Sequence, residues 1–154
     1  MIEGVNVGHA LMAGFFAAFL MSTAAYWLEG VFGLPRIDLG MLGQKYMGGD
    51  RPGWWFVGQA SHYILSMGLA LVYASGVALN LEDLFGKPLE WWWGPPAGMV
   101  YGLAVFLILP VGIVGSVTVL SIGILPRDPK ALVANVLLHL LWGATLGALY
   151  FPVR

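Results

Sequence analysis

Long stretches without any charged residue alternate with short polar segments along this chain. Four such stretches are present, at residues 4–28, 52–81, 91–126 and 131–153. Each is longer than the roughly 20 apolar residues that a helix needs to cross the hydrocarbon core of a bilayer. The pattern predicts an all-α fold, a membrane four-helix bundle with up-down-up-down topology. Its predicted spans lie near 6–28, 55–79, 97–122 and 131–151, in a single integral membrane domain covering 1–154.

The composition supports a membrane protein and excludes several classes of site. Hydrophobic residues make up 59% of the chain and charged residues only 10%, whereas soluble domains carry about 25% charged residues. The chain contains no cysteine, which excludes disulfides, thiolate metal sites and iron–sulfur clusters. A net charge of −1 gives no reason to expect nucleic acid as a partner.

The basic residues predict an orientation. With four spans, the connections 29–54 and 123–130 share one side of the membrane, and the termini share the other side with the 80–96 connection. The first side carries five of the seven basic residues. The positive-inside rule therefore places this side in the cytoplasm and both termini outside it.

Small residues recur at the spacing of close helix packing. Three G-x-x-x-G pairs lie within or beside the predicted spans, namely Gly4/Gly8, Gly98/Gly102 and Gly143/Gly147. Because lipid supplies no hydrophobic drive for helix association, glycines promote it by letting backbones approach closely. The pairs therefore indicate a packed bundle.

Two parts of the chain resemble each other. The phrases "GLPRID" (33–38) and "GILPRDP" (123–129) each follow a predicted span, and each precedes a span with a histidine and, eleven residues later, a tyrosine. This internal repeat predicts two related helical hairpins with the same topology. The longer first connection, "RIDLGMLGQKYM" (36–47), is predicted to form a short interfacial helix on the cytoplasmic surface.

Histidines of the second and fourth spans define the candidate site. His62 and His139 would both lie roughly 12 Å inside their cytoplasmic helix ends at the α-helical rise, because each follows its helix start by eight residues. An amide precedes each histidine on the same helical face, and a tyrosine follows it. These residues predict a polar seam between the two helices, formed by Gln59, His62, Tyr73, Asn135, His139 and Tyr150.

Two interpretations of the histidine pair remain open. The first is a bis-histidine site for haem b, with His62 and His139 as axial ligands and Gly143 leaving room for the ring. The second is hydrogen bonding between helices that holds the bundle in register, and we favour it. A bare metal ion is disfavoured, because two imidazoles complete neither a zinc nor a copper shell.

The predicted spans lack the groups that pumps and membrane enzymes use. No aspartate, glutamate, lysine or arginine lies inside them, although such residues usually mark ion and proton pathways. The hydroxyl residues Ser22, Thr23, Ser116, Thr118 and Ser121 have no basic partner near them in sequence that would activate them as nucleophiles. We therefore name no catalytic residue and expect a protein that is not an enzyme.

Two segments resemble a known family. The stretches 14–43 and 53–74 resemble a family of small four-helix bacterial integral membrane proteins of unknown function. The shared features are the phrase Gly33-Leu34-Pro35, an early histidine and late tyrosine (His62, Tyr73) and a final glycine-rich helix with His139. The resemblance implies the four-helix fold and a bacterial origin. A bacterial origin in turn implies the inner membrane as the location. The resemblance implies no activity.

The leading functional hypothesis is a non-catalytic subunit or accessory protein of a larger membrane complex, in particular a respiratory or photosynthetic electron-transfer assembly. Its expected partners are membrane lipid and other membrane protein subunits. The alternatives are a b-type haem electron carrier using the bis-histidine site and, behind it, a small channel or carrier.

Overall fold

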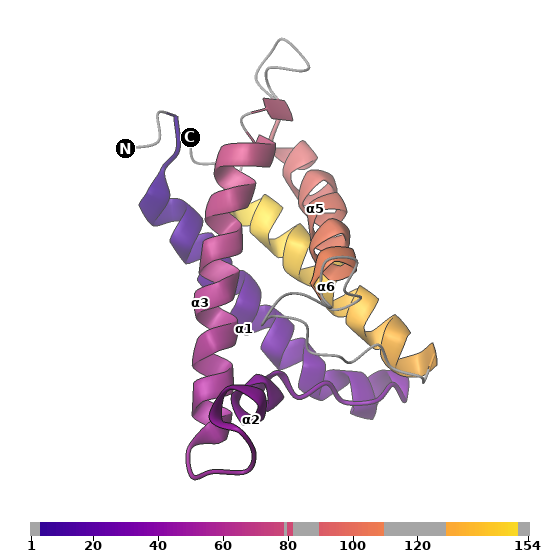
Figure 1. Cartoon of the computed structure of the whole chain (residues 1–154). Coiled ribbons are helices and arrows are strands. Elements are labelled where there is room, and N and C mark those ends of the chain that lie inside the picture. Colours follow the sequence, from indigo (N-terminus) through magenta and orange to yellow (C-terminus); the bar gives the residue numbers. More distant parts are fainter. Residues whose placement is uncertain (1–3, 79, 82–89, 110–128, 151–154) are drawn as a thin grey trace.

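The computed structural model describes residues 4–78, 80–81, 90–109 and 129–150, and these residues are helical with no strand among them (Figure 1). The α-helices are α1 (Val7–Phe32), α2 (Leu42–Met47), α3 (Trp54–Val72), α5 (Gly94–Ile108) and α6 (Pro129–Tyr150). Three shorter elements accompany them: the 3₁₀ turns η1 (Leu39–Met41) and η3 (Trp91–Trp93), and the π-helical turn η2 (Tyr73–Ala78).

Three helices are long and apolar enough to cross a membrane: Val7–Phe32, Trp54–Ala78, which joins α3 to η2, and Pro129–Tyr150. They agree with the predicted spans at 6–28, 55–79 and 131–151. The third predicted span, 97–122, is described only through Leu109, where α5 covers its first part. The second copy of the repeat, 123–129, lies outside the described residues except for Pro129.

Local sequence sets the ends of these helices. Asn6 caps the start of α1, because its side chain accepts a hydrogen bond from the His9 backbone N–H at 3.0 Å. Gly33 ends the same helix in the left-handed conformation, with φ +60°, and its N–H bonds back to the carbonyl of Glu29. The "G-L-P" phrase that follows therefore turns the chain away from α1.

The helices cross in alternating directions. In Figure 1, α1 and α5 descend, whereas α3 and α6 ascend toward the end of the molecule where the chain termini lie. Helix α1 packs against both α3 and α6, and α5 packs against α6. Helices α3 and α6 contact each other through side chains, and a cavity lies between them. The predicted seam is therefore an open space and not a close helix contact.

Glycine allows α5 and α6 to touch backbone to backbone. A methyl group at Gly98 would overlap the carbonyl oxygen of Gly143, and one at Gly143 would overlap that of Gly98. One turn away in each direction, Gly102 meets the His139 carbonyl and Gly147 meets that of Gly94. Two of the three predicted glycine pairs therefore form one shared contact.

The first predicted glycine pair has no such role. Gly4 precedes α1, and a methyl group at Gly8 would meet only the side chain of Asn6, at 3.8 Å. At Gly8 the described residues show no close helix contact. The spacing alone does not distinguish it from the pairs that do pack.

The short helix predicted within 36–47 is present as η1 followed by α2, and it docks on the start of α3. A methyl group at Gly43 would overlap the Trp54 carbonyl, and one at Gly58 would overlap the carbonyl of Gly40. The Trp55 indole covers Gly40 from the other side. The first connection is thus fixed to α3 by close backbone contact.

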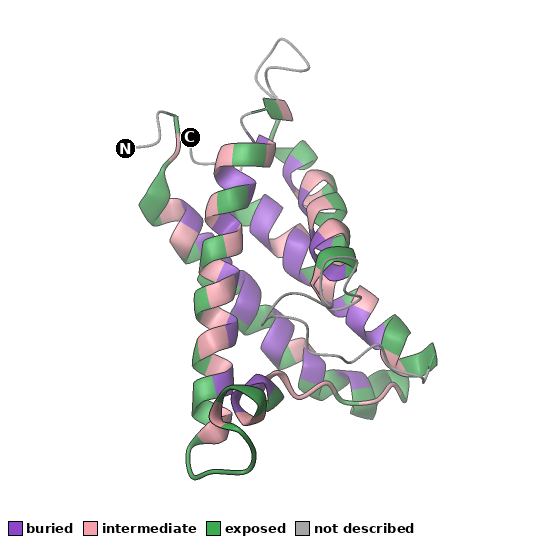
Figure 2. Ribbon diagram, viewed as in Figure 1, coloured by how far each residue is buried: buried purple, intermediate pink, exposed green. Residues whose placement is uncertain are grey.

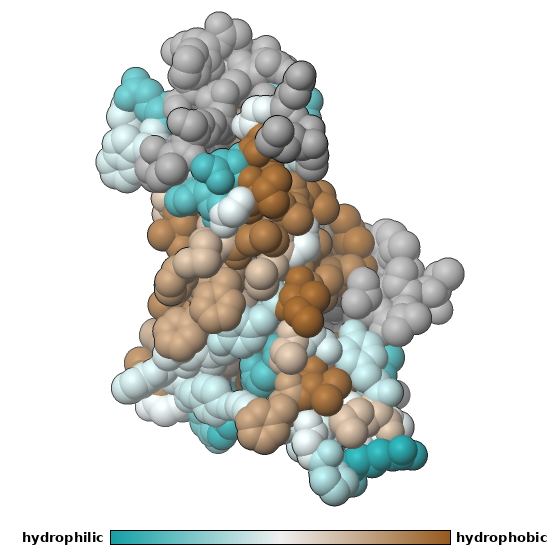
Figure 3. Space-filling model, turned by 90° about the vertical axis from the view of Figure 1, so that its left-hand side faces the viewer, coloured by the Kyte–Doolittle hydropathy of each residue, from teal (hydrophilic) through white to brown (hydrophobic). Residues whose placement is uncertain are grey.

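The outer surface of the helices is strongly apolar. Buried residues line the interior of the molecule in Figure 2, whereas many large hydrophobic side chains face outward, including Phe16, Trp27, Ile64 and Val100. Figure 3 shows hydrophobic side chains across the middle of one face and hydrophilic ones toward its two ends. This distribution is that of a protein solvated by lipid.

Candidate functional site

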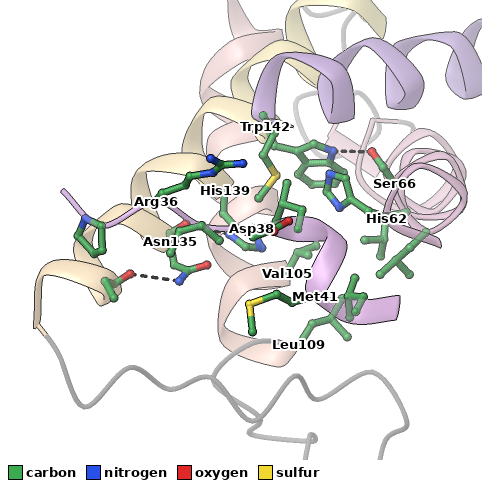
Figure 4. A pocket seen from close by; sticks show the side chains of 18 residues that line it. Arg36, Asp38, Met41, His62, Ser66, Val105, Leu109, Asn135, His139 and Trp142 are labelled. Carbon is green, nitrogen blue, oxygen red and sulfur yellow. Dashed lines mark hydrogen bonds between the residues drawn. The ribbon is translucent and has the colours of Figure 1, made fainter. Parts of the chain in front are cut away.

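A cavity of about 370 Å³ lies among α1, α3, α5, α6 and the chain that follows α1. Met21 of α1, Val105 of α5 and residues 35–39 and 41–42 of the first connection contribute to its walls. From α3 and α6 come the polar residues His62, Ser66, Asn135, His139 and Trp142 (Figure 4). The cavity is therefore lined by both predicted hairpins, and it contains both candidate histidines.

His62 is nine-tenths buried, with its side chain 9% exposed. Its Nε2 atom is buried with no hydrogen-bond partner among the described residues. A buried polar atom without a partner is costly, which makes Nε2 a candidate ligand-binding atom.

His139 has a matching arrangement on the opposite wall. Its Nδ1 lies 2.9 Å from the backbone carbonyl oxygen of Asn135, one turn earlier in α6. The Phe106 ring of α5 packs against the imidazole, with centroids 5.3 Å apart. His139 thus uses Nδ1 for a backbone contact within its own helix.

Asn135 contributes less to the cavity than expected. Its side-chain amide donates to the Ala131 carbonyl at 3.1 Å, a bond within α6, while its own carbonyl holds His139. Asn135 therefore orients His139 through the backbone, and its amide does not bridge α6 to another helix in the described structure.

A hydrogen-bonded chain crosses the bundle beside the histidines. The Trp142 indole donates from Nε1 to Ser66 Oγ at 2.6 Å, and Ser66 Oγ donates to the Gly14 carbonyl at 2.7 Å. Figure 4 shows the first of these bonds next to His62. The chain links α6 to α3 and α3 to α1, so it supplies the interhelical hydrogen bonding that we expected from the amides and histidines.

The two tyrosines of the repeat meet at the opposite end of the bundle. Tyr73 and Tyr150 are fully buried, and their rings pack edge to face with centroids 6.2 Å apart. His9 joins them, since its Nε2 lies 2.6 Å from the Leu149 carbonyl and its ring contacts Tyr150. These tyrosines are part of the interior and lie away from the cavity, whose walls they do not form.

Two charged residues reach the cavity from the first connection. Asp38 caps η1 by accepting a bond from the Gly40 N–H at 2.9 Å, and Arg36 lies over the Tyr26 ring at 4.0 Å. Both belong to the "GLPRID" phrase and line the cavity (Figure 4). Arg36 and Asp38 thus place one positive and one negative side chain in a mostly apolar lining.

Gln59 is not part of the histidine site. It lines a separate hollow between the outer sides of α1 and α3, with a volume of about 330 Å³. Aromatic side chains dominate that hollow, which is lined by Phe19, Ser22, Thr23, Tyr26, Trp27, Trp55, Gln59 and Tyr63. Ser22 Oγ is buried there with no partner among the described residues.

Gly143 faces α5. A methyl group at this position would overlap the carbonyl oxygen of Gly98. The described residues also contain no group of three or more histidine, aspartate or glutamate side chains placed to hold a metal ion. The site as described offers two imidazole nitrogens in an apolar cavity.

Sequence reasoning missed Trp142 and the residues 36–38 as parts of the site. Trp142 follows His139 by three residues, so helical spacing alone would have placed it beside that histidine. Arg36 and Asp38 belong to the repeat phrase, but nothing in their spacing indicates that the chain folds back under α1. That placement depends on the glycine contact between α2 and α3.

No family model, no curated protein and no solved structure matches this chain.

Proposed function

We propose that the chain is a four-span, up-down-up-down protein of the bacterial inner membrane that serves as a non-catalytic subunit or accessory protein of a larger membrane complex. In this proposal the larger complex is an electron-transfer assembly, and both termini of the chain lie outside the cytoplasm. The resemblance to small four-helix membrane proteins and the excess of basic residues in the 29–54 and 123–130 connections support it.

The observation that carries the proposal is the aromatic hollow between α1 and α3. Protein interfaces are enriched in aromatic anchors. This hollow combines Phe19, Tyr26 and Trp27 with the unpaired hydroxyl of Ser22. A buried hydroxyl without a partner is costly.

Mild-detergent purification at native expression, followed by identification of co-purifying proteins, tests the proposal. We expect one or more membrane subunits in fixed stoichiometry. Replacing Phe19 and Trp27 with leucine keeps the surface apolar but removes the aromatic anchors, so membrane insertion should persist and the partner should be lost.

The matched control is Phe56→Leu, which changes an aromatic residue that is 73% exposed and lies outside the hollow. It should leave the partner bound. A stable homomer with no partner, obtained from the unaltered chain, would contradict the proposal.

The second candidate function is a haem b electron carrier. It is favoured by the free Nε2 of His62 and by the Nδ1 contact of His139, because ligating histidines usually donate their other ring N–H to a backbone carbonyl. The position of Gly143 against α5 disfavours it. An absorption spectrum after haem supplementation decides: a Soret band that is lost in His62→Phe supports this function, and absence of the band removes it.

A further inference from the structure

The first connection brings a cation and an anion to the entrance of the cavity. Arg36 and Asp38, which we call the charged mouth, both line the cavity (Figure 4), and Arg36 is also exposed, so the cavity reaches the protein surface. Helix α1 is long and apolar enough to cross a membrane, and residues 33–38 follow its last residue directly. The charged mouth therefore lies where a bilayer changes from hydrocarbon to head groups.

Arg36 supplies hydrogen-bond donors at this mouth. Its guanidinium lies over the Tyr26 ring at 4.0 Å, and no described carboxylate forms an ion pair with it. A guanidinium carries five N–H donors in a fork that matches the oxygens of a carboxylate or a phosphate. The mouth can therefore bind an oxyanion.

Asp38 supplies the opposite charge two residues further along the chain. One of its carboxylate oxygens accepts from the Gly40 N–H at 2.9 Å, and a carboxylate has lone pairs for further donors on both oxygens. A ligand with negative charge alone would be repelled by Asp38, because like charges placed side by side weaken binding. Charge complementarity therefore favours a head group that carries both an oxyanion and a cation with N–H donors.

The space behind the mouth is elongated and mostly apolar. Its lining residues recur every three or four positions on α6, from Ala131 to Trp142, and on α3, from His62 to Leu69. At the α-helical rise these two faces extend for about 16 Å and about 10 Å. The volume of about 370 Å³ lies at the small end of ligand pockets, about 300–1,000 Å³, and suits part of one hydrocarbon chain.

We propose that the cavity binds a zwitterionic glycerophospholipid with a primary ammonium head group, of the phosphatidylethanolamine class. Its phosphate accepts from Arg36, its ammonium donates to Asp38, and one acyl chain enters the cavity while the other stays in the bilayer. The buried Nε2 of His62 takes no part in this binding. The inference goes beyond the proposed function, because a lipid site of this kind does not depend on a partner subunit.

Native mass spectrometry of the detergent-purified protein tests the head-group preference. The protein is mixed with equal amounts of phosphatidylethanolamine, phosphatidylcholine and phosphatidylglycerol that carry identical acyl chains. Phosphatidylcholine has a cation without an N–H donor, and phosphatidylglycerol has no cation. Since partly exposed ion pairs are weak, we expect phosphatidylethanolamine to be retained about 2- to 5-fold more than either of the others.

Charge variants test the two residues of the mouth separately. Asp38→Asn keeps a side-chain cap for η1 but removes the charge, so the preference over phosphatidylglycerol should disappear. Arg36→Gln should lower the retention of all three phospholipids by about 2- to 5-fold. The matched control is Arg51→Gln, which changes an exposed basic residue of the same connection that does not line the cavity, and it should change neither quantity.

A second pair of variants tests the acyl chain. Val105→Trp fills part of the cavity from α5, so it should lower the retention of all three phospholipids and leave their order unchanged. Val100→Trp adds the same side chain at a position of α5 that is 72% exposed, and it should leave retention unchanged. Circular dichroism and the unfolding midpoint of each variant separate lost binding from lost folding.

Several outcomes would overturn the lipid proposal. They are equal retention of the three phospholipids, strongest retention of phosphatidylglycerol by the unaltered chain, and a preference that persists in both Asp38→Asn and Arg36→Gln. None of them bears on the co-purification test of the proposed function. Conversely, a partnerless homomer that prefers phosphatidylethanolamine through both charges would contradict the proposed function alone.

Discussion

At the scale of single residues, the interior is organised by a few polar side chains that each serve two helices. Ser66 is the clearest example, because its hydroxyl accepts from Trp142 and donates to Gly14. Hydrogen bonds between membrane helices average about 0.6 kcal/mol in stability. A larger cost arises when a buried donor loses its partner, about 1–3 kcal/mol.

This asymmetry predicts unequal effects at the two ends of one bond. Trp142→Phe removes the donor and leaves Ser66 bonded to Gly14, so its hydrogen-bonding cost should be about 1 kcal/mol. Ser66→Ala leaves the buried indole N–H unpaired and also removes the Gly14 bond, so we expect about 1–3 kcal/mol. Denaturation in mixed detergent micelles measures both, and the double variant gives the coupling. A loss of stability no larger than a few tenths of a kcal/mol in Ser66→Ala would contradict these hydrogen bonds.

His9 gives a second residue-scale prediction. Its imidazole binds the Leu149 carbonyl, one of the last four carbonyls of α6, which have no partner within the helix. His9→Phe keeps a ring beside Tyr150 and removes this bond, so the end of α6 should fray. Hydrogen exchange should rise at residues 146–150 and stay unchanged at residues 132–138, whereas equal protection throughout α6 would show that the bond has no such role.

At the scale of elements, glycine decides which helices approach closely. The described α5 and α6 meet at Gly98, Gly102, Gly143 and Gly147, where any side chain would overlap main-chain atoms. Other helical glycines, such as Gly30 and Gly68, have nothing within 4 Å of the position of a methyl group. Packed and unpacked glycines look alike in the sequence, and they differ only in the atoms that face them in the structure.

This contrast supplies a matched pair of substitutions. Gly98→Ala should cost about 1–3 kcal/mol, as expected for overpacking, because α5 must move away from the Gly143 carbonyl. Gly68→Ala adds the same methyl group to an exposed face of α3, and its effect should stay within about 0.5 kcal/mol. The unfolding midpoint in detergent measures both, and equal effects would contradict the packing.

Charge-free stretches of the sequence predicted the three described helices that are long and apolar enough to cross a membrane, because length and apolarity are visible residue by residue. The site was predicted less completely. Helical spacing predicted that His62 and His139 share one site, and both line the same cavity. It also placed Gln59 beside His62, whereas Gln59 lines the separate hollow between α1 and α3. The position of Gly143 depends on a contact with α5 that no local pattern records.

At the scale of the whole molecule, the orientation in the membrane is open to a direct measurement. The chain has no cysteine, so single cysteines report their own positions without background. We expect Glu90→Cys to react with an impermeant maleimide added to intact cells, because the 80–96 connection is proposed to face outward. Tyr46→Cys, on α2 in the first connection, should react only after permeabilisation. The reverse pattern would show that the chain is inserted in the opposite sense.

The backbone contact between α5 and α6 has a consequence for assembly in the bilayer. Glycine has no rotamers to lose, so the glycine contacts themselves carry no side-chain entropy cost. We therefore expect these two helices to pair early, with α1 and α3 joining them afterward. The cavity, whose walls come from all of these helices, then forms only at that last step.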